Sequence, residues 1–170
     1  LELKDGVFEV LATSGDNYLG GDDWDQVLID FLIQKFKEKT GVSLEKDRRA
    51  LQRLREEAEN VKKALSASVE TKAVAPFISV NQDGPLHLEE TITRQQFEDM
   101  TSHLLERTIE AIHNALTDAN LAKEDIDDIL LVGGMTRMPA VAALVNKQLD
   151  RTPNKKINPD EVVAVGAGTQ

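Results

Sequence analysis

The stretch Leu130-Leu131-Val132-Gly133-Gly134-Met135-Thr136-Arg137-Met138-Pro139 decides how the rest of this sequence is interpreted. The apolar run Ile129–Val132 is typical of a strand buried on both faces, and two glycines end it abruptly. Pro139 suits a first helical turn, and apolar residues follow it at helical spacing, so a helix is expected to begin there.

A strand, a glycine pair and a helix start together let backbone come close to a ligand that lies over the end of a sheet. The planar guanidinium of Arg137 could stack on a base or bind oxygens, which suggests a nucleotide as the ligand. The alternative is ordinary turn chemistry, because the sequence contains neither GxGxxG nor GxxxxGK[ST]. The residues alone leave both interpretations open.

Composition limits the class of protein. With 170 residues, of which 41% are hydrophobic, the chain can bury one good core or two small ones. A net charge of −10 argues against nucleic acid or an anionic membrane as the main partner. The absence of cysteine excludes disulfides and thiolate metal sites. The longest apolar run, Ala140–Val145, is too short to span a bilayer, and the N-terminus has no basic-then-apolar signal pattern. We therefore expect a soluble, intracellular protein, and a cytoplasmic location.

Both ends of the sequence suggest a piece of a longer chain. The segment Leu1–Leu3 starts within a strand-like pattern without an initiator Met, and Val162–Gln170 is typical of a helix that is still running.

The N-terminal part of the chain predicts a hairpin and a helix. Asp5-Gly6 joins the alternating segments Leu1–Lys4 and Val7–Thr13, which is a strong β-hairpin signal. Asp22 and Asp23 are then expected to cap a helix that ends near Gly41. Its apolar face, in which Trp24 is expected to anchor the core, consists of Trp24, Val27, Leu28, Phe31, Leu32 and Phe36.

A second helix is predicted from Asp47 to Leu65, with a regular apolar stripe. On another face, helical spacing places Glu59, Lys62 or Lys63, and Ser66 one turn after another. Such a row could hydrogen-bond a polyhydroxylated ligand. On spacing alone the simpler alternative is stronger, namely that Glu59 and Lys63 form an i,i+4 surface pair and Ser66 marks the helix end.

The remaining elements follow from turn and capping signals. The segment Val69–Val80, interrupted by Pro76, and the segment Leu86–Ile92 predict a hairpin with an edge or bulge at the proline. A capping box at Thr93–Gln96 begins a long helix that is expected to stop by Asn120, and a helical turn is expected at Lys123–Asp125. Asn158–Glu161 has the features of another helix start. The spacing of the histidines supports no metal site.

Five separated blocks of this sequence resemble the bacterial DnaK branch of the seventy-kilodalton heat-shock chaperone family, in the family's order and from end to end of the chain. They are Gly15–Asp25, Ala50–Arg55, Lys62–Ser66, Leu131–Pro139 and Asn158–Ala164. The resemblance implies an α/β fold, lobe II of an actin-like (ribonuclease H-like) ATPase domain. Residues 1–19 and 100–170 would form the inner α/β subdomain, and residues 20–99 the inserted outer α+β subdomain.

The resemblance also implies an adenine-nucleotide site, for ATP or ADP. By position, Glu59 and Lys62 would hold the ribose hydroxyls, and Ser66 would reach the adenine edge. Gly133 and Gly134 would border ribose and phosphate, while Arg137 and Lys63 would flank the base, and Asp160 would line the same pocket. Met135 stands where relatives usually have a small hydroxyl residue, and Lys63 stands where they vary, so these two contacts depart from the family pattern.

Hydrolysis is not expected of this chain. In relatives, magnesium and the phosphates are held by parts of the parent protein outside this sequence, and these parts also contain the lysine needed for hydrolysis. Mg²⁺ would therefore bind only in the longer parent. The resemblance implies further partners: a GrpE-type nucleotide-exchange factor on the outer subdomain, and, in the parent, lobe I, a peptide-binding domain and a J-domain co-chaperone. An interaction module that docks the exchange factor is therefore the alternative to nucleotide binding.

Overall fold

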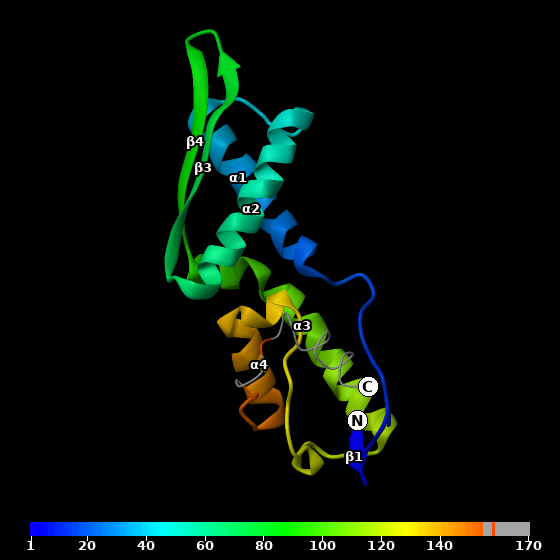
Figure 1. The fold of residues 1–170 in the computed structure, drawn as a ribbon. Coiled ribbons are helices and arrows are strands. Elements are labelled where there is room, and N and C mark those ends of the chain that lie inside the picture. Colours follow the sequence, from blue (N-terminus) through cyan, green and yellow to red (C-terminus); the bar gives the residue numbers. More distant parts are fainter. Residues whose placement is uncertain (155–157, 159–170) are drawn as a thin grey trace. The chain divides into compact units, whose positions relative to one another are not determined.

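The computed structural model describes residues 1–154 and 158, and the chain divides into two compact units (Figure 1). Residues 1–19 and 103–170 belong to one unit, and residues 20–102 form the other. The elements are β1 (Glu2–Lys4), β2 (Val7–Glu9), α1 (Gly21–Thr40), α2 (Arg48–Ala67), β3 (Glu70–Asn81), β4 (Gly84–Thr93), α3 (Arg94–Ala119), the 3-10 turns η1 (Lys123–Asp125) and η2 (Gly134–Arg137), and α4 (Pro139–Leu149).

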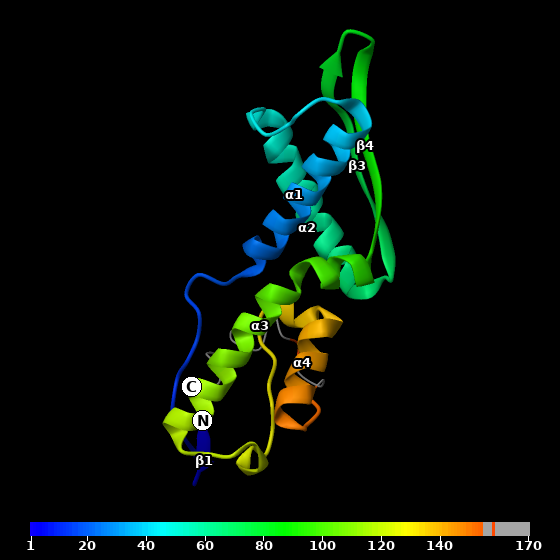
Figure 2. The ribbon, with the colours of Figure 1, turned by 180° about the vertical axis from the view of Figure 1, so that it is seen from behind.

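Within residues 20–102, helix α1 packs against α2, and the β3–β4 hairpin lies along both helices, as the opposite views in Figures 1 and 2 show. The start of α1 corrects the predicted caps. Gly20 is the N-cap, and Asp23 lies inside the helix, where its carboxylate accepts a hydrogen bond from the Gly20 N–H at 2.7 Å. Gly41 ends the helix in the left-handed conformation with φ 73°, as predicted.

Helix α2 forms where the sequence predicts it. The Asp47 carboxylate caps the helix by accepting from the N–H groups of Arg49 (2.9 Å) and Ala50 (3.1 Å). The apolar stripes of α1 and α2 supply most of this unit's core, which includes Trp24, Leu28, Leu32, Phe36, Ala50, Leu54, Ala58, Val61 and Leu65.

The β3–β4 hairpin is antiparallel and carries the irregularity that Pro76 predicted. The register shifts between Ala75 and Ser79, and Phe77 adopts a φ of 52° within the bulge. The bulge is fastened to α2 because the Arg53 guanidinium donates to the carbonyls of Pro76 at 2.6 Å and Phe77 at 3.1 Å. His87 adds a second contact, since its Nδ1 accepts from the Phe77 N–H at 3.0 Å.

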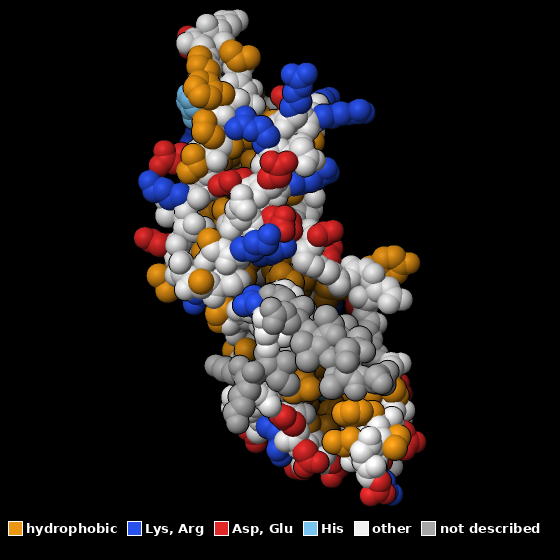
Figure 3. Space-filling model, viewed as in Figure 1, with side chains coloured by type: hydrophobic (Ala, Val, Ile, Leu, Met, Phe, Trp, Pro, Cys, Tyr) orange, Lys and Arg blue, Asp and Glu red, His pale blue; other side chains and the backbone are white. Residues whose placement is uncertain are grey.

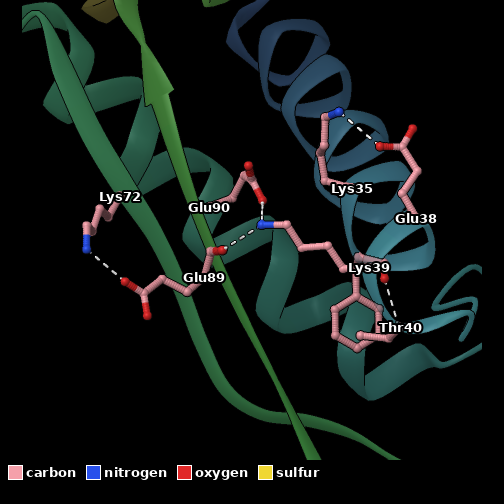
Figure 4. A network of polar contacts seen from close by, with 8 residues as sticks. Lys35, Glu38, Lys39, Thr40, Lys72, Glu89 and Glu90 are labelled. Carbon is pink, nitrogen blue, oxygen red and sulfur yellow. Dashed lines mark hydrogen bonds and ion pairs between the residues drawn. The ribbon is translucent and has the colours of Figure 1, made fainter.

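A polar network joins the C-terminal part of α1 to β4 (Figure 4). The Lys39 ammonium donates to the Glu89 carbonyl at 3.4 Å and to the Glu90 carboxylate. On the hairpin itself, the Lys72 ammonium pairs across the strands with the Glu89 carboxylate at 2.8 Å. Largely exposed pairs of this kind add little stability.

The other unit begins with the β1–β2 hairpin. Asp5 and Gly6 both have positive φ, 51° and 77°, which matches the twisted two-residue turn that their sequence predicted. The second strand ends at Glu9 rather than at the predicted Thr13. All residues of both strands are exposed, including Leu3, Val7 and Phe8, so this hairpin buries no apolar face against the described residues.

The loop between the hairpin and α1 is held to α3 within the same unit. The Arg107 guanidinium donates to the Asp16 carboxylate, with Nε at 2.9 Å from Oδ2, and to the Tyr18 carbonyl at 3.4 Å. The Tyr18 N–H, first, and then the Arg107 guanidinium hold the pKa of Asp16 below its usual value. A charged side chain and a backbone donor therefore hold the Asp16 carboxylate of this loop in place.

The predicted boundaries of α3 are confirmed. Thr93 and Gln96 form the capping box, in which the Thr93 Oγ1 accepts from the Gln96 N–H at 3.2 Å and the Gln96 Oε1 accepts from the Thr93 N–H at 3.0 Å. The helix stops before Asn120, which has φ 55°. Among the described residues, none of the helices is both long and apolar enough to cross a membrane.

Candidate functional site

Four predicted site residues lie on α2, near its C-terminal end: Glu59, Lys62, Lys63 and Ser66. The helix places them beside, not within, the stripe of Ala58, Val61 and Leu65 that packs into the core. Burial of that stripe fixes the rotation of α2 and so decides which way the polar row faces.

The surface pair that spacing predicted is present. The Lys63 ammonium lies 2.7 Å from the Glu59 carboxylate, and the two side chains are 67% and 52% exposed. The hydrogen bond from Lys63 lowers the pKa of Glu59, so the carboxylate is ionised at neutral pH. An exposed pair of this kind adds little stability. Glu59 Oε1 accepts from Lys63, and a carboxylate has further acceptor capacity that a ligand hydroxyl could use.

Lys62 is placed differently from Lys63, because its ammonium is directed at α1. It donates to the Asp25 carboxylate at 2.6 Å and to the Gly21 carbonyl at 3.0 Å. The Lys62 and Asp25 side chains are only 13% and 15% exposed. Asp25, which lies 37 residues from Lys62, was not among the predicted site residues. Its place in the Gly15–Asp25 block, one turn after the start of α1, was the available signal.

The Asp25 carboxylate is incompletely satisfied. Its Oδ1 atom is buried and has no hydrogen-bond partner among the described residues. Burial raises the pKa of Asp25 and outweighs the opposing effect of the Lys62 ammonium, while the negative charge of Glu59 raises it further. Asp25 and Glu59 also line one surface cavity of about 290 Å³ between α1 and α2, together with Asp22, Gln26, Ile29, Gln52, Arg55 and Glu56.

Ser66 lies at the end of the row. Its hydroxyl donates to the Lys62 carbonyl at 3.2 Å, one turn back along α2, and the helix ends one residue later at Ala67. The hydroxyl oxygen can still accept a hydrogen bond from a ligand.

The second group of predicted residues follows the run Ile129–Val132, and here the structure differs from the prediction. This run makes only an isolated parallel bridge, Leu130 to Asn154, among the described residues. Ile129 is buried, but Leu130 and Val132 are 51% and 45% exposed. The expectation of a strand buried on both faces was therefore wrong, because a strand is covered only where neighbouring strands and helices flank it.

The two glycines have different roles in the turn that follows. Gly133 has φ 93° and ψ 152°, a conformation that a side chain would strain. Its carbonyl accepts from the Thr136 N–H at 3.1 Å and from the Thr136 hydroxyl at 2.6 Å. Gly134 begins η2, where an added Cβ would meet nothing within 4 Å among the described residues. Packing in this part of the chain gives no reason for a glycine at 134.

Arg137 and Met135 lie in η2, directly before α4, which begins at Pro139 as predicted. The Arg137 guanidinium is exposed and donates to the Asn158 side-chain carbonyl at 3.0 Å. Met135 is half-buried. Asp160 lies outside the described residues, as does most of the predicted Asn158–Glu161 helix start.

The predicted site residues thus form two clusters. Glu59, Lys62, Lys63 and Ser66 belong to the unit of residues 20–102, and the turn from Gly133 to Arg137 belongs to the other unit. Within residues 1–154 and 158 there is no group of three or more histidine, aspartate or glutamate side chains that could hold a metal ion.

In a comparison with known protein families, one family model matches the chain along its whole length. The family model described as Hsp70 protein matches residues 1–170.

Proposed function

Because the chain belongs to the Hsp70 family, a family of nucleotide-binding ATPase chaperones, we propose that it binds ATP and ADP through their adenosine moiety. In this proposal Glu59 and Lys62 bind the ribose hydroxyls and Ser66 contacts the adenine edge. Gly133 and Gly134 border ribose and phosphate, Arg137, Lys63 and Met135 contact the base, and Asp160 lines the pocket.

The observation that carries the proposal is the polar row on α2. The two hydroxyls of a ribose can each donate and accept, so they can pair with one acceptor and one donor that lie close together. Glu59 and Lys62 stand one helical turn apart. Two hydrogen-bond donors of the Lys62 ammonium are used by Asp25 and Gly21, which leaves a third for a ligand. Because Lys62 is already held in place, ligand binding does not have to include the entropic cost of ordering its side chain.

Calorimetric titration of the chain with ADP tests the proposal. Lys62→Met should weaken binding about tenfold or more, because a hydrogen bond from a charged donor is lost. Lys35→Met is the matched control, since Lys35 is also a helical lysine in an ion pair, with Glu38 at 2.9 Å, but it lies on α1 and is not part of the row on α2. Equal affinities for the two variants and the unchanged chain would contradict the proposal.

The turn from Gly133 to Arg137, the diglycine turn, gives a second test in the other unit. A Cβ at Gly134 is tolerated by the described residues, so Gly134→Ala should leave the fold intact. If nucleotide lies against this backbone, the same Cβ should reduce ADP affinity several-fold. Normal ADP binding by both Gly134→Ala and Arg137→Ala would remove the turn from the proposed site.

We also propose that the chain alone does not hydrolyse ATP. The residues assigned above contact sugar, base and the start of the phosphate chain, whereas phosphoryl transfer depends on groups that position the attacking water and the terminal phosphate. Magnesium-dependent phosphate release that is lost in Lys62→Ala and absent from a mock preparation would overturn this part of the proposal.

The β3–β4 hairpin favours a second candidate function, the docking of a nucleotide-exchange factor. Figure 3 shows hydrophobic side chains at the surface of this hairpin, and its exposed apolar residues include Val74, Phe77 and Val80. Apolar side chains on an exposed two-stranded ribbon are suited to protein contact. Binding of an exchange factor that is lost in Phe77→Ser, with ADP binding unchanged, would support this function.

A further inference from the structure

We infer that Asp25 is a positioning residue for ribose recognition, which acts by fixing the Lys62 ammonium. The inference rests on the proposed adenosine binding and deepens it, because it names the residue in α1 on which the α2 row depends. Three observations carry it: the geometry of the Lys62 contacts, the burial of both side chains and the unsatisfied oxygen of Asp25.

The contacts fix both the place and the direction of the ammonium. Asp25 Oδ2 and the Gly21 carbonyl accept from Lys62 at 2.6 and 3.0 Å, and Gly21 is the first residue of α1. A lysine ammonium has three donors in a tetrahedral arrangement, so two fixed contacts set the direction of the third. Lys63, one residue further along α2, pairs with Glu59 of its own helix and is mostly exposed.

The state of Asp25 argues against a role in stability alone. A buried ion pair stabilises a fold only when the remaining hydrogen-bonding positions are also satisfied. Asp25 Oδ1 is buried without a partner among the described residues, and burial raises the pKa of this carboxyl. An apolar pair at these two positions would avoid both penalties. A fixed Lys62 charge, one helical turn from Glu59 on α2, explains the arrangement.

The test compares ADP with 2′,3′-dideoxy-ADP in calorimetric titrations of the full 170-residue chain. Asp25→Asn should reduce ADP affinity about tenfold, the effect of one charge-assisted hydrogen bond, and should leave the affinity for the dideoxy analogue unchanged. In a Lys62→Met background, Asp25→Asn should have no further effect on ADP affinity, because both variants remove the same contact.

The control is Asp30→Asn, which makes the same chemical change on the same helix. Asp30 is exposed and accepts a hydrogen bond from Gln26 at 2.8 Å, without contact to Lys62 among the hydrogen bonds of the described residues. Asp25→Glu, which keeps the charge, should recover part of the ADP affinity. It also serves as the test variant if circular dichroism shows that Asp25→Asn does not fold.

A measurement without nucleotide gives an independent result. In ¹⁵N-resolved NMR spectra of lysine ammonium groups, the Lys62 signal, assigned by its loss in Lys62→Met, should be protected from exchange with water. It should broaden or disappear in Asp25→Asn and persist in Asp30→Asn. A structural pair that does not orient Lys62 for ligand would show this change without any loss of discrimination between ADP and the dideoxy analogue.

The possible failures are distinct. If the unchanged chain binds no ADP, the proposed function is wrong, and an unchanged Lys62 signal in Asp25→Asn would then overturn the positioning role as well. If the unchanged chain binds ADP, two results overturn only the inference about Asp25. One is that Asp25→Asn binds ADP equally well, and the other is that its affinities for ADP and for the dideoxy analogue fall to the same extent.

Discussion

Residues 20–102 and the remainder of the chain are built in different ways. Among the described residues, all but three of the buried apolar side chains lie in residues 20–102, and the exceptions are Leu104, Ile129 and Met138. The other unit exposes the whole β1–β2 hairpin and half of the Ile129–Val132 run. One unit is therefore held by a core, and the described part of the other is held more by turns, caps and single polar contacts.

The difference shows what each kind of element requires. Helices α1 and α2 and the β3–β4 hairpin follow one another along the chain, so each apolar face meets a partner that is close in sequence. A strand such as Ile129–Val132 needs neighbours on both sides, and these come from distant segments. Four experiments test this difference between the two units.

Core truncation should separate the two regions most clearly. Leu54 is fully buried in α2, whereas Leu130 is 51% exposed. Leu54→Ala should reduce the free energy of unfolding by about 2–5 kcal/mol, because buried contacts are lost and a cavity remains. Leu130→Ala should change it by less than about 1 kcal/mol. Urea unfolding followed by circular dichroism measures both, and equal losses would show that the contrast in burial is wrong.

The fastening of the bulge should have a smaller effect. Arg53→Met removes the hydrogen bonds to the Pro76 and Phe77 carbonyls and should reduce the free energy of unfolding by about 1–2 kcal/mol. Amide exchange in the bulge should accelerate, which hydrogen-exchange mass spectrometry can localise. Arg55→Met, which changes an exposed arginine two residues along α2, is the control. Unchanged exchange in the bulge would show that the strand irregularity does not depend on Arg53.

The diglycine turn should depend on one backbone conformation. Gly133→Ala places a side chain at φ 93° and should reduce the free energy of unfolding by about 1–2 kcal/mol. Gly134→Ala should be neutral or stabilise by up to about 1 kcal/mol, because alanine is favoured over glycine within a helical turn. Thermal unfolding of both variants gives the comparison, and equal effects would mean that the turn is not specified by Gly133.

Two carboxylates should give the smallest effects, with opposite dependence on pH. Folding raises the pKa of Asp25, so its contribution to the free energy of unfolding should fall as the pH rises from 3 through about 4 and above. Folding lowers the pKa of Asp16, so its contribution should rise over the same range. The differences between the unchanged chain and Asp25→Asn or Asp16→Asn, measured by urea unfolding from pH 3 to 6, should therefore have opposite slopes. Slopes of the same sign would contradict the contrast between a buried and a backbone-bonded carboxylate.

Local signals in the sequence predicted most of the elements. Helix start and stop signals act within one helical turn, so their effect can be recognised without knowledge of the fold. Examples are Gly41, Asp47, the Thr93–Gln96 box and Pro139. Pro76 likewise predicted the bulge in β3. The cap of α1 was misplaced because Asp22 and Asp23 favour the first turn of a helix as well as its cap.

Contacts between distant residues could not be predicted in this way. Spacing along α2 revealed the Glu59–Lys63 pair, but it gave no indication that Lys62 contacts Asp25, 37 residues earlier. The Arg107–Asp16 contact joins residues 91 positions apart and was also missed. For the candidate site, the sequence identified the row of side chains, whereas the partners that fix each of them depend on how helices pack.

The single tryptophan of the chain, Trp24, is buried in α1, one residue before Asp25. Its indole emission should therefore shift to longer wavelength when residues 20–102 open, and it should also respond to changes in charge at its neighbour. The protein thus contains an intrinsic fluorophore one residue before the carboxylate that pairs with Lys62, and a change in its emission on nucleotide addition would report the proposed binding without a label.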